Sequence, residues 1–135
     1  MFFTIEEIQK WKIDSDGFSC GPNNVKIWIA QSAIISKSAR IGKSASIGEG
    51  AGFNITPLYI LGTKHIVNIY SHTKIAIGCE IHNVVWWREH YKEVGEKNGY
   101  NKQQIQEYQW YIEICSEWLR YQKEIGALKT KKEQP

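Results

Sequence analysis

Large aliphatic side chains recur at every sixth position through the middle of the chain. Ile29 opens a hexad, and the same position is filled in turn by Ile35, Ile41, Ile47 and Phe53. The second position of the first four hexads is small, the fourth is Ser or Gly, and the fifth is Ala. Neither a helix, with about 3.6 residues per turn, nor a strand, with a period of two, produces this pattern. We therefore predict a chain that turns a corner every six residues, with the aliphatic side chains inside.

These hexads, which span residues 29–58, resemble the hexapeptide-repeat family. Members of that family fold as left-handed parallel β-helices, and many of them are acyltransferases. The resemblance implies coils of about 18 residues each, so the hexads make fewer than two coils and too little core to stand alone. Family members characteristically form trimers, and a homotrimer or a dimer of trimers is what the resemblance implies. The alternative, a Ser/Gly/Ala-rich linker, does not explain why isoleucine keeps its register.

The segments around the hexads follow other patterns. Apolar runs separated by turn residues predict a small antiparallel meander after the hexads, and the period then changes to that of helices. We divide the chain into an N-terminal helix and lead-in strand (1–28), the hexapeptide β-helix (29–58), a β meander (59–82), a helical C-terminal region (83–126) and a flexible tail (127–135). The expected fold class is α+β: a short left-handed parallel β-helix of about two coils, a meander and two C-terminal helices, in a homo-oligomer.

The second C-terminal helix, expected from Asn101 to about Ile125, is apolar on two faces. One stripe comprises Ile105, Tyr108, Ile112, Cys115 and Leu119, and the other comprises Tyr111, Ile114, Trp118, Tyr121 and Ile125. A helix that is apolar on two faces is usually covered on both. We expect one stripe to pack within the subunit and the other against a second subunit. The alternative is that both stripes meet one core.

Composition narrows the classes of function. Of the 135 residues, 42% are hydrophobic and 23% charged, which excludes a disordered polyampholyte. The net charge of +3 is too small for a protein that binds a nucleic-acid polymer through bulk charge. Aromatic residues make up 13%, more than a core of this size needs, so we expect some rings to meet a ligand or another subunit.

Cysteine usage and hydropathy bear on the compartment. The 3 cysteines are widely spaced and lack a CxxC pair, which favours ordinary thiols in a reducing compartment over disulfides or a zinc site. No stretch reaches the roughly 18 apolar residues of a membrane span, and the N-terminus lacks the pattern of a signal peptide. We therefore expect a cytoplasmic protein without a membrane partner.

The densest group of chemically useful side chains lies in residues 78–90, where a strand leads into a helix. A helix N-terminus favours an anion, Trp86 could stack on a base, and Arg88 could bind phosphate. The candidate ligand-binding residues are His82, Asn83, Trp86, Trp87, Arg88 and His90, together with the basic hexad residues Lys37, Arg40 and Lys43. The alternatives are that Asn83 only caps the helix, that both tryptophans belong to the core, and that the basic residues are solvated.

The histidines bear on catalysis and on metal binding. Acyltransferases of the hexapeptide family typically use a His between neighbouring coils as general base, and all four histidines of this chain lie outside the hexads. His82 and His90 are eight residues apart, which is not the spacing of a helical metal-binding pair, so no metal is expected.

The leading hypothesis is a non-enzymatic protein, without a cofactor, that binds a small anionic nucleotide at subunit interfaces. The hexads, the segment Ile-Gly-Cys-Glu-Ile-His and the Trp-Trp pair are also similar to small proteins encoded by phages and prophages, some of which sequester nucleotide immune signals. That similarity implies an anti-defence sponge, located in the host cytoplasm if the protein is phage-encoded. One alternative is an acyltransferase that uses acetyl-CoA, with His82 as general base. Another is a structural trimerisation or virion accessory protein.

Overall fold

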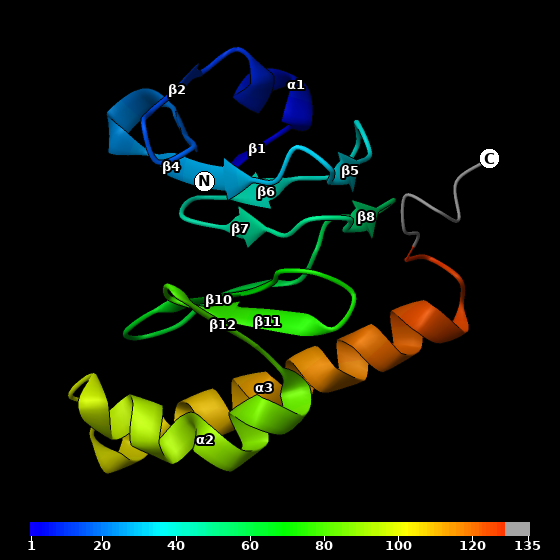
Figure 1. The fold of residues 1–135 in the computed structure, drawn as a ribbon. Coiled ribbons are helices and arrows are strands. Elements are labelled where there is room, and N and C mark those ends of the chain that lie inside the picture. Colours follow the sequence, from blue (N-terminus) through cyan, green and yellow to red (C-terminus); the bar gives the residue numbers. More distant parts are fainter. Residues whose placement is uncertain (129–135) are drawn as a thin grey trace.

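The computed structural model describes residues 1–128, and its N-terminal half consists of short strands with one short helix (Figure 1). In chain order the elements are β1 (Phe2–Phe3), α1 (Ile5–Gln9), β2 (Lys12–Ile13), β3 (Phe18–Cys20), the 3₁₀ turn η1 (Pro22–Asn24), β4 (Lys26–Ile29), β5 (Ile34–Ile35), β6 (Ile41–Gly42), β7 (Ser46–Ile47) and β8 (Gly52–Phe53). Four of them form a sheet in the order β2–β3–β4–β7, called here the N-terminal sheet. The pairs β1–β6 and β5–β8 form two small sheets of their own.

The left-handed parallel β-helix predicted for residues 29–58 is not present, so this part of the predicted fold class is wrong. Parallel pairing is limited to two residue pairs between β4 and β7 and two between β5 and β8, and these pairs lie in separate sheets. β6 pairs antiparallel with β1 instead. A coil stacks only where each of its sides has a parallel neighbour, and here the N-terminal strand occupies one side. Because the coils are absent, the predicted trimer has no structural basis in them. Self-association stays a prediction.

The six-residue pattern has a different explanation in packing. Ile47 and Phe53 belong to one buried hydrophobic cluster and Ile41 to another, and the half-buried Ile29 and Ile35 pack against both. The fifth-position alanines of the second, third and fourth hexads are buried as well: Ala39, Ala45 and Ala51. The apolar side chains at the first position of the hexads therefore pack in two adjoining cores rather than in the interior of one β-helix.

Four antiparallel strands follow the hexads and form the meander. They are β9 (Tyr59–Leu61), β10 (Ile66–Ile69), β11 (Lys74–Ile77) and β12 (Glu80–Asn83), in the spatial order β12–β11–β10–β9. Gly78, with φ of 58°, and Cys79 form the tight turn between β11 and β12, a conformation that favours glycine.

Two helices complete the described chain and cover one side of the meander, while the N-terminal strands lie on its other side (Figure 1). α2 (Val84–Lys97) begins at Asn83, whose side chain accepts a hydrogen bond from the Trp86 N–H. α3 (Lys102–Glu124) begins at a capping box formed by Asn101 and Gln104. The α+β class and the two predicted C-terminal helices are confirmed. Among the described residues, neither helix is long and apolar enough to cross a bilayer.

The larger core lies between the meander, α2 and α3. Its buried members from the helices are Trp87, Tyr108, Ile112, Cys115 and Leu119, and its members from the meander are Val67, Ile69, Ile75 and Ile77. The first apolar stripe predicted for α3 therefore packs within the chain. After α3 the chain turns back, and the buried Leu128 forms a bridge with Phe53. Residues 129–135, most of the predicted flexible tail, lie outside the described residues.

Candidate functional site

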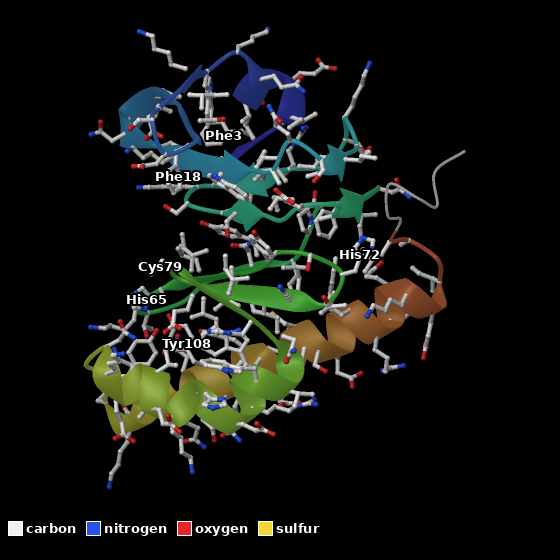
Figure 2. The ribbon with its side chains drawn as sticks, viewed as in Figure 1. Phe3, Phe18, His65, His72, Cys79 and Tyr108 are labelled. Carbon is white, nitrogen blue, oxygen red and sulfur yellow. The ribbon has the colours of Figure 1, made fainter. Side chains whose placement is uncertain are left out.

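A cavity of about 430 Å³ lies between the N-terminal sheet and the meander. Its lining residues are Phe18, Trp28, Ser44, Ser46, Tyr70, Gly78, Cys79 and Ile81. Figure 2 labels Phe18 and Cys79, which come from the two layers on either side of the cavity. The volume falls within the range of small-molecule sites, and most of the lining is apolar with a few polar groups, as in such sites generally.

Strand register places three of the lining residues in one row. Phe18 on β3 lies opposite Trp28 on β4, and Trp28 lies beside Ser46 on β7. Side chains at paired positions of neighbouring strands point to the same face of a sheet. The alternation along β4 therefore sends Ile27 into the core, where it is buried, and turns Trp28 outward to the cavity.

The rings of Trp28 and Tyr70 are parallel to within 6°, and their centroids are 6.4 Å apart. This separation is at the long end of the range for direct aromatic pairs. The Tyr70 ring lies over Gly48, where a Cβ would overlap it, and the Gly48 N–H donates a hydrogen bond of 2.7 Å to the Tyr70 carbonyl. Burial, with the negative charge of Glu49, raises the pKa of Tyr70, so its hydroxyl keeps its proton at neutral pH. The two rings thus offer fixed flat surfaces to the cavity.

Polar groups line the same cavity. Ser44 adopts a φ of 66°, which is unusual for a residue other than glycine, and its N–H donates to the Lys26 carbonyl at 3.0 Å. Asn68 holds Ser46 through the backbone, because its side chain donates to the Ser46 carbonyl at 2.8 Å. Within the described residues, neither serine hydroxyl has a hydrogen-bond partner, so both can bond a ligand.

A cation lies near this row of residues. Lys26 is two residues before Trp28 on the same face of β4, and its Nζ lies 5.8 Å from the centroid of the Phe18 ring. Its ammonium group forms an ion pair of 3.1 Å with Asp14, and the hydrogen bond from Lys26 to Asp14 raises the pKa of Lys26. The charge is partly compensated but remains accessible, since the Lys26 side chain is more than half exposed.

Trp86, predicted to stack on a base, lies between two histidine rings. The His82 ring is 3.3 Å from it and inclined by 15°, and the His90 ring is 4.2 Å away and inclined by 16°, both measured between centroids. His90 Nδ1 donates to the Trp86 carbonyl at 2.8 Å. Histidines therefore already cover both faces of the indole, which leaves no free face for a base.

The other predicted residues of this segment have contacts within the chain. Asn83 caps α2, and Trp87 is buried with its Nε1–H donating to the Ile75 carbonyl at 2.9 Å. Arg88 donates two hydrogen bonds to Glu113, at 2.9 and 2.7 Å. Hydrogen bonding to Glu113 raises the pKa of Arg88, so its charge is engaged in joining α2 to α3. Ligand binding by these residues stays a prediction.

The basic hexad residues lie outside the cavity lining. Lys37 is exposed and forms a long ion pair of 3.8 Å with Glu6. Arg40 is exposed, and its N–H donates to Thr56 at 2.9 Å; Lys43 is also exposed, and its carbonyl accepts a hydrogen bond of 2.6 Å from Tyr59.

His82, the alternative general base, lies on the far side of its strand from the cavity. Ile81 lines the cavity, and the alternation along β12 turns His82 and Glu80 to the opposite face. His82 Nε2 and Glu80 Oε1 are 3.1 Å apart, a contact that can orient an imidazole. The same imidazole stacks on Trp86, so the His–Glu pair does not face the cavity lining.

None of the predicted ligand-binding residues lines the cavity, although Gly78, Cys79 and Ile81 fall within the segment 78–90. For Trp28 a signal existed, because in Val25–Ile29 the isoleucines alternate with Lys26 and Trp28, which places a large ring on the outer face of the strand. For Tyr70 no local signal existed, since Gly48, which receives its ring, lies far away in sequence.

No group of three or more His, Cys, Asp or Glu residues lies close enough to hold a metal ion within residues 1–128. Compared with models of known protein families, with curated proteins and with solved structures, the chain matches none of them.

Proposed function

We propose that the protein binds a small ligand with a flat aromatic ring, of the nucleotide type, in the cavity between the N-terminal sheet and the meander. The observation that carries the proposal is the parallel pair of Trp28 and Tyr70, both of which line the cavity. Stacking on an aromatic side chain is the common way in which proteins hold a base without reading its sequence. Phe18 and Ile81 supply further apolar surface.

The remaining groups favour a nucleotide over a purely apolar ring. Ser44 and Ser46 provide hydroxyls for a sugar or a base edge, and Lys26 provides a positive charge beside the aromatic row. A phosphate directed towards Lys26 would compete with Asp14 for the ammonium group. The site thus combines a stacking surface, hydrogen-bonding groups and a cation, which together match the three parts of a nucleotide.

In the same proposal the protein retains its ligand unchanged, as a phage-encoded sponge for a nucleotide immune signal would, and acts in the cytoplasm. Retention is supported by the orientation of His82 and Glu80, which face away from the cavity. A reducing compartment is supported by the cysteines, which are free thiols in the described chain.

Isothermal titration calorimetry with AMP, cyclic AMP, ADP-ribose and acetyl-CoA tests the proposal. We expect at least one of the first three to bind, and Trp28→Leu and Tyr70→Leu each to weaken binding by roughly 5- to 150-fold, because a stacked base contributes about 1–3 kcal/mol. Trp110→Leu is the matched control, since it removes an exposed ring on α3 and should leave the affinity unchanged.

Three outcomes would overturn the proposal. Binding that survives Trp28→Leu but is lost in Trp86→Leu would move the site to the start of α2. Turnover of acetyl-CoA that is lost in His82→Ala would favour the acyltransferase. No binding of any nucleotide by the folded protein would favour a structural role.

A further inference from the structure

The outward face of α3 carries a row of large apolar side chains that the chain itself leaves exposed, apart from Trp118, which also packs against the larger core. Trp110, Ile114, Tyr121 and Ile125 are between 43% and 66% exposed, and the half-buried Trp118 lies between them. These five residues are called the outer row. The second stripe predicted from the sequence contained Tyr111 where the outer row contains Trp110. Tyr111 packs against the core instead and donates a hydrogen bond of 2.7 Å to Glu107.

We propose that the outer row is a dimer interface, at which α3 packs antiparallel against α3 of a second copy of the chain. The inference is independent of the ligand cavity, since none of the outer-row residues lines that cavity. A contiguous apolar patch of this kind is among the largest that a monomer exposes, and such patches are often functional.

The spacing of the outer row favours a second copy as the partner. A two-fold dimer uses the same patch twice, so the patch has to be complementary to itself. Trp110 and Ile114 precede Trp118 by eight and four residues, and Ile125 and Tyr121 follow it by seven and three. With a two-fold axis near Trp118, an antiparallel pair therefore places Trp110 opposite Ile125 of the second copy and Ile114 opposite its Tyr121. These two levels of the contact each join one aromatic and one aliphatic side chain, and the Trp118 side chains of the two copies meet near the axis.

The charges beside the outer row are already compensated within the chain. Glu113 is paired with Arg88 at 2.7 Å, and Arg120 is paired with Glu117 at 2.8 Å and with Glu124 at 2.6 Å. The three carboxylates and two guanidinium groups leave one net negative charge per copy, so a second copy meets little like-charge repulsion. A strongly charged partner, such as a nucleic acid, would find no free charge of the opposite sign among these side chains.

The available surface is close to the minimum for a specific contact. Large aromatic side chains bury about 150–250 Å² each, so the exposed parts of the outer row amount to on the order of 400 Å² per copy. Two copies plus a polar rim approach the lower limit of about 1,200 Å² for specific interfaces. Trp110, Ile114 and Glu117 also border a hollow of about 490 Å³, into which a side chain of the second copy can pack.

Sedimentation equilibrium on the full chain tests the proposal. We expect a dimer at about 100 µM, and we expect Ile114→Glu and Tyr121→Glu each to raise the dissociation constant at least 100-fold, since each would bury an unpaired carboxylate. Leu61→Glu is the matched control, because it places the same charge at an apolar residue that is 78% exposed on β9. Circular dichroism of each variant verifies that the helices remain folded.

Cross-linking tests the direction of the helices. In a Cys79→Ser background, a mixture of Ile114→Cys and Tyr121→Cys chains should form a mixed disulfide, and neither variant alone should do so. A monomer mass that persists up to about 1 mM would overturn the proposal. So would an assembly that survives Ile114→Glu, or cross-linking of Ile114→Cys chains to one another.

Discussion

Two hexad glycines each lie beneath a tyrosine ring, and this contact accounts for the small second position of their hexads. A Cβ on Gly48 would overlap the Tyr70 ring, and one on Gly42 would overlap the Tyr59 ring. The two rings lie in different places: Tyr70 lines the cavity, and Tyr59 packs against the smaller core, which is the buried cluster that contains Ile41. Glycine at the second position of these two hexads is therefore explained by the close packing of tyrosine rings, not by a backbone conformation that only glycine adopts.

The glycine contacts allow a matched comparison of two substitutions. Gly48→Ala and Gly42→Ala should each destabilise the protein by about 1–3 kcal/mol, because a ring has to shift in both variants. Only Gly48→Ala should also weaken nucleotide binding, since it displaces Tyr70. Urea unfolding followed by tryptophan fluorescence measures the first effect, and calorimetry measures the second. Equal loss of affinity in both variants would contradict a specific role for Tyr70.

The cysteines differ in environment and should differ in reactivity. Burial raises the pKa of the Cys115 thiol to about 12, so this thiol stays protonated at pH 8 and should react only after unfolding. Cys79 is exposed at the cavity and should react in the folded protein. Labelling with a thiol-reactive dye at pH 8, followed by peptide mass spectrometry, measures both.

A bound nucleotide should slow the labelling of Cys79 and leave that of Cys20 unchanged. Equal slowing at both cysteines would argue against occupancy of the cavity.

At the scale of elements, α2 and α3 are held together by the Arg88–Glu113 contact and by a shared core. The sequence placed Arg88 in a ligand site, whereas the structure pairs it with a carboxylate on the neighbouring helix. Both side chains of the pair are about half exposed, and salt bridges in such positions contribute little to stability.

Replacing Arg88 distinguishes a residue that binds the ligand from one that only joins α2 to α3. Arg88→Gln should lower the free energy of unfolding by less than about 1 kcal/mol, because the pair is solvated, and should leave nucleotide affinity unchanged. Urea unfolding and calorimetry on the same samples measure the two quantities. A tenfold or greater loss of affinity with unchanged stability would show instead that Arg88 binds the ligand.

An element could be predicted from the sequence where the residues that define it lie close together in the chain. Asn83 and Asn101 lie directly before the helices that they cap, so the starts of α2 and α3 can be read from neighbouring residues. The pairing of β6 with β1 and the position of Tyr70 over Gly48 depend on residues far apart in sequence, which no local pattern records. The hexads thus indicated where the strands and corners lie but not which strands pair, and the cavity depends on that pairing.

At the scale of the whole molecule, the larger core joins segments from the hexads to the end of the described chain. Ile47 and Phe53 of the hexads pack in one cluster with strands of the meander, with α3 and with Leu128. The chain after α3 returns towards β8, as Figure 1 shows, and the Phe53–Leu128 bridge fixes it there. The hexads, the meander, the helices and Leu128 therefore share one core.

This arrangement predicts that one residue near the end of the described chain stabilises the hexads. Leu128→Ala should lower the free energy of unfolding by about 2–5 kcal/mol, the usual cost of truncating a buried leucine. Leu61→Ala, at an exposed leucine, should change it by less than about 0.5 kcal/mol. Urea unfolding compares the two. A small effect of Leu128→Ala would mean that the larger core is complete without the segment after α3.

The contact between Phe53 and Leu128 also constrains folding during synthesis. A ribosome releases the hexads long before it releases α3, so Phe53 and Ile47 emerge without the surface that later covers them. During that interval the nascent chain exposes apolar side chains, and closing the core requires contacts of large sequence separation, which form slowly. Newly made chains are therefore most prone to aggregate, and most dependent on chaperones, between the emergence of β8 and that of α3.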